Sequence, residues 1–129
     1  MNDERKEFMF SIDKTRQGMF STIKPKELNE ILSKNLDEVI LLVFSTQYSG
    51  ESIMLCASID ELAEEYEDGV RFFHINADEN ADYIESQGIH QLPTLFIYAK
   101  SELVYQGKGL HSKSMLRRTL KTHIDAINK

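Results

Sequence analysis

Residues 39 to 52 read VILLVFSTQYSGES, and this stretch decides the fold. Its first part, from Val39 to Phe44, is apolar throughout and shows no alternation. Such a run is typical of a central strand that is covered on both faces, although a buried helix turn looks similar. A polar loop around Gly50 follows, and from about residue 52 to residue 66 the apolar positions recur at helical spacing. A buried strand that leads through a short loop into a helix indicates an α/β fold.

The flanking sequence predicts further strands and helices on both sides of this stretch. Upstream, a short strand over residues 19–23 stops before Pro25, which suits the first turn of a helix. Downstream, the pattern predicts strands over residues 70–76, 94–98 and 103–106, a short helix over residues 81–86, and a last helix that Ser112 caps. The early alternation implies parallel strands, whereas the short turn between the last two strands implies an antiparallel hairpin. We therefore expect a mixed central β-sheet of about five strands, flanked by helices on both faces.

The length of 129 residues suits one domain with one hydrophobic core. We expect this domain over residues 19–129, with a polar N-terminal extension over residues 1–18. The extension holds Phe8, Phe10 and Ile12, whose alternation is too short to assign. An extra strand, an extra helix turn and a frayed tail all stay open for it.

Composition and charge narrow the possible partners. The formal net charge is −6 and no long basic run occurs, which disfavours nucleic acids and anionic membrane surfaces. No apolar run is long enough to span a membrane. Cys56 is the only cysteine, so no internal disulfide can form, and the charged N-terminus does not begin a signal-peptide core. These features predict a soluble cytoplasmic protein, and because metal-ligand spacing does not recur, we expect no metal site and no cofactor.

From about residue 19 to residue 127 the sequence resembles the thioredoxin family. The resemblance rests on segments that occur in the family's order, namely residues 41–52, 59–66, 73–80 and 88–94 and the glycine Gly109. Residues 88–94 are similar to the family's Gly-Ile-x-x-x-Pro-Thr signature, in which the proline, here Pro93, is cis. The resemblance implies a thioredoxin fold.

The sequence departs from the family at the redox site. The two redox cysteines fall at Ser49 and Ser52, and the proline between them falls at Glu51. The family's buried acid and its lysine partner fall at Val43 and His74. A serine hydroxyl cannot replace the thiolate that thiol–disulfide exchange requires. We therefore expect a redox-inactive domain that is not a dithiol–disulfide oxidoreductase, with Ser49 placed to cap the following helix.

The resemblance also implies a peptide-binding groove, which needs no cysteine. A cis-proline exposes the backbone of its preceding residue, which in the family pairs with an extended peptide like an added strand. We expect the groove to consist of Tyr48, Gly50, Glu51, Gln91, Leu92, Pro93 and Gly109. The function expected from these features is an adaptor or holdase that binds extended or partly unfolded protein segments, as a monomer or weak dimer.

Three other functions stay open at this point. The first is a monothiol or glutathione-linked redox protein that uses Cys56, against the simpler interpretation of Cys56 as a buried, inert thiol. The second is a structural subunit of a larger assembly that uses residues 1–18 as its contact. The third is serine-based hydrolysis by Ser49 or Ser52 with His90 as the base, which is disfavoured because no acid is evident to orient His90.

Overall fold

A five-stranded mixed sheet runs through the centre of the computed structural model, which describes residues 20–66 and 69–128. The strand order is β1 (Phe20–Thr22), β3 (Val70–Asn76), β2 (Val39–Ser45), β4 (Thr94–Ala99) and β5 (Glu102–Lys108). Strands β1 and β2 run parallel to β3, whereas β4 is antiparallel to β2 and β5 is antiparallel to β4. The predicted mixed sheet is confirmed. The predicted extension over residues 1–18 lies outside the described residues.

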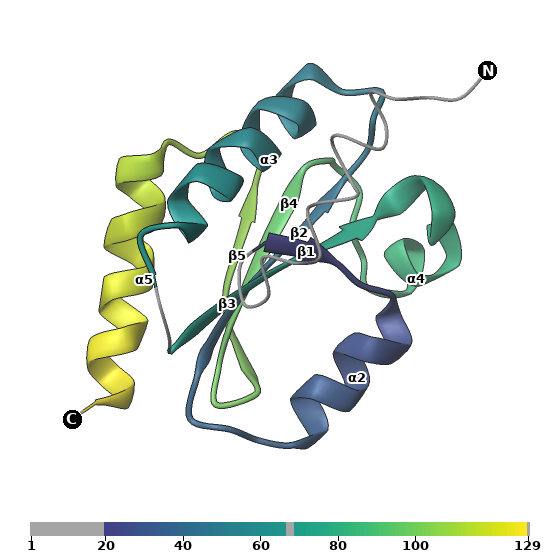
Figure 1. The fold of residues 1–129 in the computed structure, drawn as a ribbon. Helices are drawn as coiled ribbons and strands as arrows, with labels where there is room; N and C mark the ends of the chain where they lie inside the picture. Colours follow the sequence, from purple (N-terminus) through teal and green to yellow (C-terminus); the bar gives the residue numbers. More distant parts are fainter. Residues whose placement is uncertain (1–19, 67–68, 129) are drawn as a thin grey trace.

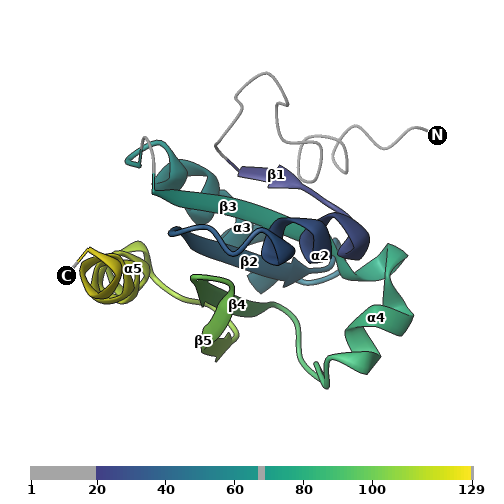
Figure 2. The same ribbon diagram turned by 90° about the horizontal axis from the view of Figure 1, so that it is seen from below.

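Helices cover both faces of this sheet (Figures 1 and 2). Helices α3 (Gly50–Ala63) and α5 (Lys113–Ile127) pack on one face, and α2 (Pro25–Ser33) and α4 (Ala81–Ser86) pack on the other. A 3-10 turn, η1 (Ala77–Glu79), follows β3. All residues of β2 are buried, which explains why its apolar run does not alternate. Its side chains contribute in turn to the two cores, one on each face.

The helix after β2 begins earlier than the sequence pattern suggests. Helix α3 starts at Gly50 rather than near residue 52, because Ser49 is its N-cap. It ends at Ala63, and residues 64 and 65 form a turn. The other predicted elements lie within two residues of their expected ends.

The hairpin of β4 and β5 forms the edge of the sheet opposite β1. Its turn places Lys100 at φ 52° and Ser101 at φ 65°, the left-handed geometry that matches the twist of a two-residue hairpin. Leu103 pairs with Tyr98 and Tyr105 with Ile97, so Val104 is an extra residue in a β-bulge. A bulge of this kind twists the exposed edge and discourages pairing with another strand.

Candidate functional site

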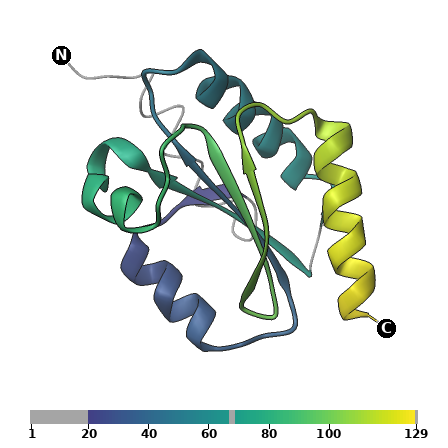
Figure 3. The ribbon, with the colours of Figure 1, turned by 180° about the vertical axis from the view of Figure 1, so that it is seen from behind.

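The predicted site residues gather where several strands end. Phe44 pairs with Thr94, so the loop after β2 and the loop before β4 lie at the same end of the sheet. Thr94 also pairs with Lys108, which brings the end of β5 to this place. In Figure 3 the β4–β5 turn lies at the bottom of the sheet and the β5–α5 connection lies at the opposite end. The topology thus brings together the three loops that the sequence analysis assigned to the groove.

Ser49 and Ser52 both serve the start of helix α3. The Ser49 hydroxyl accepts a hydrogen bond from the Ser52 amide at 3.2 Å. The Ser52 hydroxyl is buried and accepts one from the Thr46 amide at 3.3 Å. Glu51 is exposed in the first turn, where the helix dipole favours a negative charge. The structure thus uses both serines to satisfy backbone amides around a helix start.

The loop before α3 is held by a carboxylate from another part of the chain. The Thr46 hydroxyl donates to Asp78 Oδ1 at 2.7 Å, and the Gln47 amide donates to Asp78 Oδ2 at 3.2 Å. The Tyr48 amide in turn donates to Thr46 Oγ1 at 3.2 Å. These bonds fix the backbone from which the Tyr48 side chain projects, 81% exposed. The sequence analysis missed Thr46 and Asp78 as site residues, although Asp78 belongs to a segment that carries the family resemblance.

The loop before β4 carries Gln91, Leu92 and Pro93, three of the residues predicted to line the groove. The bond between Leu92 and Pro93 is cis, and the Pro93 carbonyl accepts a hydrogen bond from the Gly109 amide at 2.8 Å. A Cβ atom on Gly109 would lie 3.5 Å from the Gln91 side-chain nitrogen, so these two residues face one another. Gln91 is exposed, Leu92 is half-buried, and Pro93 is buried. The structure therefore places Gly109 beside the loop that carries Gln91, Leu92 and Pro93.

A chain of polar side chains lies buried beneath the start of α3. The Cys56 thiol donates to Ser45 Oγ at 3.4 Å, and Ser45 Oγ lies 2.6 Å from His74 Nε2. His74 Nδ1 lies 3.2 Å from Thr22 Oγ1. Because the thiol donates to Ser45 Oγ, the Ser45 hydroxyl can donate its own hydrogen to His74 Nε2. In the neutral ring Nε2 is then the acceptor, so Nδ1 carries the proton and donates to Thr22 Oγ1. Val43 pairs with His74 in the register of β2 and β3, as the resemblance implied.

Burial controls the acid–base properties of this chain. Desolvation raises the pKa of Cys56 to about 11, against a smaller lowering by the Ser45 hydroxyl and a small rise from the Asp60 charge. Desolvation also lowers the pKa of His74 to about 3. At neutral pH the thiol is protonated and the imidazole is uncharged. Sequence reasoning did not single out Ser45, because a lone serine at a strand end carries no signal of its own.

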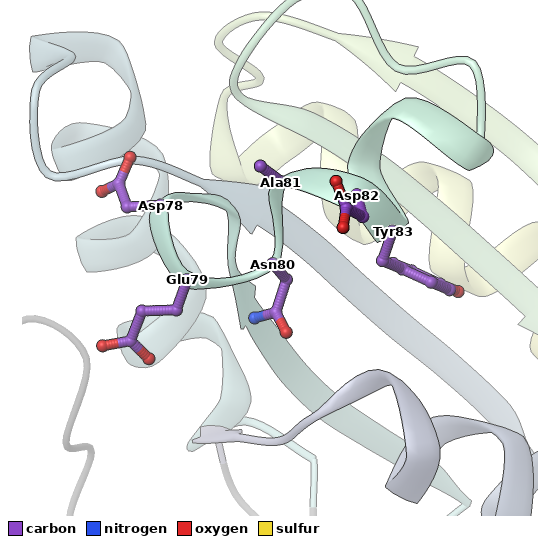
Figure 4. A pocket seen from close by; sticks show the side chains of 6 residues that line it. All are labelled: Asp78, Glu79, Asn80, Ala81, Asp82 and Tyr83. Carbon is purple, nitrogen blue, oxygen red and sulfur yellow. The ribbon is translucent and has the colours of Figure 1, made fainter.

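The acidic turn after β3 forms an open hollow rather than a metal centre. Figure 4 shows its lining side chains, which are Asp78, Glu79, Asn80, Ala81, Asp82 and Tyr83. Asp78 is already engaged by the Thr46 loop. Within residues 20–66 and 69–128, no group of three His, Cys, Asp or Glu side chains is arranged to hold a metal ion. In the same part of the chain, no helix has the length and apolar character needed to cross a bilayer.

Comparison with known proteins identifies relatives of this sequence. The thioredoxin family model matches residues 19–122. Thioredoxin from Pyropia yezoensis is 35% identical over 95 residues, which cover 74% of this chain and 87% of that protein. Thioredoxin 2 from Chlorobaculum tepidum is 34% identical over 90 residues, covering 70% of this chain and 83% of that protein.

Solved structures agree on the fold. Chloroplastic thioredoxin z superimposes with a TM-score of 0.76 at 22% identity, covering 84% of this chain and 96% of that one. Fasciola hepatica thioredoxin gives a TM-score of 0.69 at 21% identity, with coverage of 78% and 94%. The predicted thioredoxin fold is confirmed.

The relatives also correct the functional prediction. From Ser49 and Ser52 we predicted a redox-inactive adaptor or holdase that is not an oxidoreductase. That prediction is wrong, because the relatives of 30–35% identity are named thioredoxin and support a redox function. The prediction gave the loss of the two redox cysteines more weight than the remaining thiol, Cys56, whose redox use was kept only as an alternative. The thioredoxin family model matches residues 19–122, and the matches to relatives of at least 30% identity cover more than two thirds of this sequence. This chain therefore belongs to the thioredoxin family.

Proposed function

We propose that this protein carries out thiol–disulfide exchange on protein substrates, with Cys56 as its thiol. The observation that carries the proposal is that Cys56 is the only cysteine in a chain whose relatives are named thioredoxin. Exchange requires a thiolate, and no other side chain of this protein can supply one. The second thiol must come from outside the chain, and we assign it to a low-molecular-weight thiol such as glutathione.

The exchange proceeds in two balanced steps. The Cys56 thiolate attacks one sulfur of a substrate disulfide, the substrate S–S bond breaks, and the departing sulfur leaves as a thiolate that takes up a proton. The product is a mixed disulfide between Cys56 and the substrate. The thiolate of the small thiol then attacks the substrate sulfur of this bond and releases Cys56 as a thiolate. The net reaction converts a substrate disulfide into a free thiol and a substrate–small-thiol disulfide.

The structure makes this exchange slow in the resting state. The Cys56 residue is 3% exposed, so the first turns of α3 must open before a substrate sulfur can reach it. With the pKa of Cys56 raised to about 11, only about one thiol in ten thousand is ionised at neutral pH. Ser45 is the group placed to stabilise the thiolate, because its hydroxyl lies next to the sulfur and can turn to donate to it.

The groove supplies a surface for the substrate protein. Tyr48 offers an exposed aromatic face on one side, and Gln91 and Gly109 form the other side. We assign the backbone at Leu92, in the loop before β4, to pairing with an extended segment, as the family resemblance implies. A protein with one cysteine and no internal disulfide fits a reducing compartment, so we place this activity in the cytoplasm.

Disulfide reduction tests the proposal. Insulin reduction is followed with glutathione as the small thiol, for the unchanged protein and for Cys56→Ser and Cys56→Ala. The matched control is Ser58→Ala, a half-buried position on the same helix. Turnover above the glutathione background that both Cys56 variants lose and Ser58→Ala keeps supports the proposal. Turnover that survives loss of Cys56, or its absence in the unchanged protein, contradicts it. Thermal unfolding of each variant shows whether the fold is retained.

A further inference from the structure

A second hydrogen-bonded chain runs from strand β5 into the groove wall. The Tyr105 hydroxyl lies 2.8 Å from His111 Nε2. His111 Nδ1 lies 3.0 Å from the Gly109 carbonyl oxygen. The Gly109 amide donates to the Pro93 carbonyl at 2.8 Å. The path therefore links Tyr105, three residues before the end of β5, to the cis-proline loop.

The donors and acceptors in this chain have one consistent direction. A carbonyl oxygen can only accept, so Nδ1 of His111 must carry a proton and donate to Gly109. In the singly protonated ring, Nε2 then accepts from the Tyr105 hydroxyl. The His111 side chain is buried, and its ring meets the Tyr105 ring edge-on with centroids 6.0 Å apart. Both packing and hydrogen bonding thus hold the imidazole in one orientation.

The residue at position 107 is matched to this pair. A Cβ atom on Gly107 would lie 2.5 Å from His111 Nε2 and 2.8 Å from the Tyr105 hydroxyl. Both distances are far below normal contact, so any side chain at this position would push the two groups apart. The hydrogen bond between Tyr105 and His111 therefore requires glycine at position 107. We call these three residues the Tyr105–His111 unit.

The unit acts on the groove through Gly109. This residue has φ +78°, a conformation that glycine adopts freely and does not hold by itself. Its amide is fixed by Pro93 and its carbonyl by His111, so both neighbouring peptide groups are held. Gly109 also lies next to the Gln91 side chain, on the same side of the groove. We infer that Tyr105 and His111 are positioning residues that fix the Gly109 side of the groove and set its affinity for an extended substrate segment. This inference rests on the groove being the substrate surface of the proposed function.

Two variants remove the unit stepwise. Tyr105→Phe deletes one hydroxyl and keeps the ring, while His111→Leu deletes the donor to Gly109. His111→Asn is the rescue variant, because its amide nitrogen can replace Nδ1 as a donor to Gly109. The matched controls are Tyr66→Phe, a partly buried tyrosine that packs against the core on the α3 and α5 face, and His123→Leu on α5.

The first measurement is hydrogen exchange of the Gly109 amide by NMR. We expect exchange about three- to tenfold faster in Tyr105→Phe, faster still in His111→Leu, and partly restored in His111→Asn. Nitrogen chemical shifts of His111 should show the proton on Nδ1 in the unchanged protein. A proton on Nε2 alone, or Gly109 exchange equal to the controls in every variant, overturns the inference.

The second measurement is the Kd for insulin B chain whose cysteines are blocked by carboxymethylation. This probe cannot undergo exchange, so its binding is independent of the redox step. We expect the Kd to rise about three- to tenfold in Tyr105→Phe and more in His111→Leu, with recovery in His111→Asn. A variant that loses thermal stability but keeps its Kd would show a merely structural role and overturn the inference, as would absence of binding by the unchanged protein. If the unchanged protein shows no insulin turnover but the Kd values of the variants change as expected, the proposed function is contradicted and this inference stands.

Discussion

Ser45 Oγ lies 2.6 Å from Nε2 of His74, in the interior of the sheet and beneath the start of α3. This contact joins strands β2 and β3, and the Cys56 thiol extends it to the helix. His74 stands where the family resemblance implied a charged partner, yet its neighbour Val43 offers no charge. Burial without an opposite charge keeps the imidazole neutral, and Ser45 satisfies it as a neutral hydrogen-bond partner.

The first prediction concerns stability against pH. Burial lowers the pKa of His74 from its ordinary value of 6.5 to about 3, so between these values the unfolded chain binds a proton that the folded chain does not. The contribution of His74 to stability is therefore complete above pH 6.5 and is lost as the pH falls toward 3. The free energy of unfolding, measured with urea, should fall between pH 6.5 and pH 4.5 in the unchanged protein. This fall should be about 2 kcal/mol larger than the fall in His74→Gln.

The control for this prediction is His123→Gln, which alters a partly exposed histidine on α5. It should keep the full pH dependence of the unchanged protein. Equal pH dependence in His74→Gln and the unchanged protein would show that His74 is not the group responsible.

The second prediction concerns the thiol. The Ser45 hydroxyl lowers the pKa of Cys56 against the larger effect of burial. Ser45→Ala should therefore move the midpoint of Cys56 alkylation to higher pH, and Ser58→Ala should leave it in place. Mass spectrometry of the alkylated protein across a pH series measures the midpoint. A midpoint that stays or falls in Ser45→Ala would remove Ser45 from the proposed mechanism.

The sequence reveals much of the fold and only part of the site. The unbroken apolar run from Val39 to Phe44 predicts a central strand, because a strand covered on both faces is apolar at every position. The meeting of the loops after β2, before β4 and after β5 at one end of the sheet was likewise predictable from spaced motifs. The polar contacts were not, because Ser45 and His74 meet only through the register of β2 and β3. The same limit applies to Asp78, which reaches Thr46 across 32 positions of the chain.

The functional prediction failed for a related reason. The positions of Ser49 and Ser52 were interpreted through one mechanism, the dithiol reaction, and an inert Cys56 was preferred over the monothiol alternative. Spacing along the sequence places Cys56 one helical turn past Ser52 but does not show that its sulfur contacts Ser45. That contact depends on how α3 packs against β2.

The third prediction concerns the loop that carries Tyr48. Thr46→Val keeps the size of the side chain but removes both the donor to Asp78 and the acceptor for the Tyr48 amide. The Kd for the blocked insulin B chain should rise about three- to tenfold, because the loop then loses order before binding. Thr46→Ser restores the hydroxyl and should restore the Kd. If Thr46→Val binds as tightly as the unchanged protein, the contact with Asp78 does not position Tyr48.

The fourth prediction separates the helix cap from the chemistry. Ser49→Ala removes the acceptor for the Ser52 amide and should lower the free energy of unfolding by about 1 kcal/mol. Ser49→Asp keeps an acceptor and should retain most of this stability. Insulin reduction should not fall in either variant, since Ser49 takes no part in exchange, and it should rise in Ser49→Ala because the uncapped first turns of α3 open more often. A large loss of turnover in Ser49→Asp, with stability intact, would assign Ser49 a chemical role.

Trapping of a mixed disulfide on Cys56 tests the central claim most directly. The folded protein is incubated with oxidised glutathione over a pH series, and the intact mass is followed with time. We expect one glutathione adduct, located at Cys56 by peptide mapping. Below the raised pKa of the thiol, its rate of formation should increase about tenfold for each unit by which the pH is raised, because the thiolate fraction increases by that factor. Cys56→Ser should form none, and Ser58→Ala should match the unchanged protein. Absence of an adduct at every pH at which the protein stays folded would contradict exchange through Cys56.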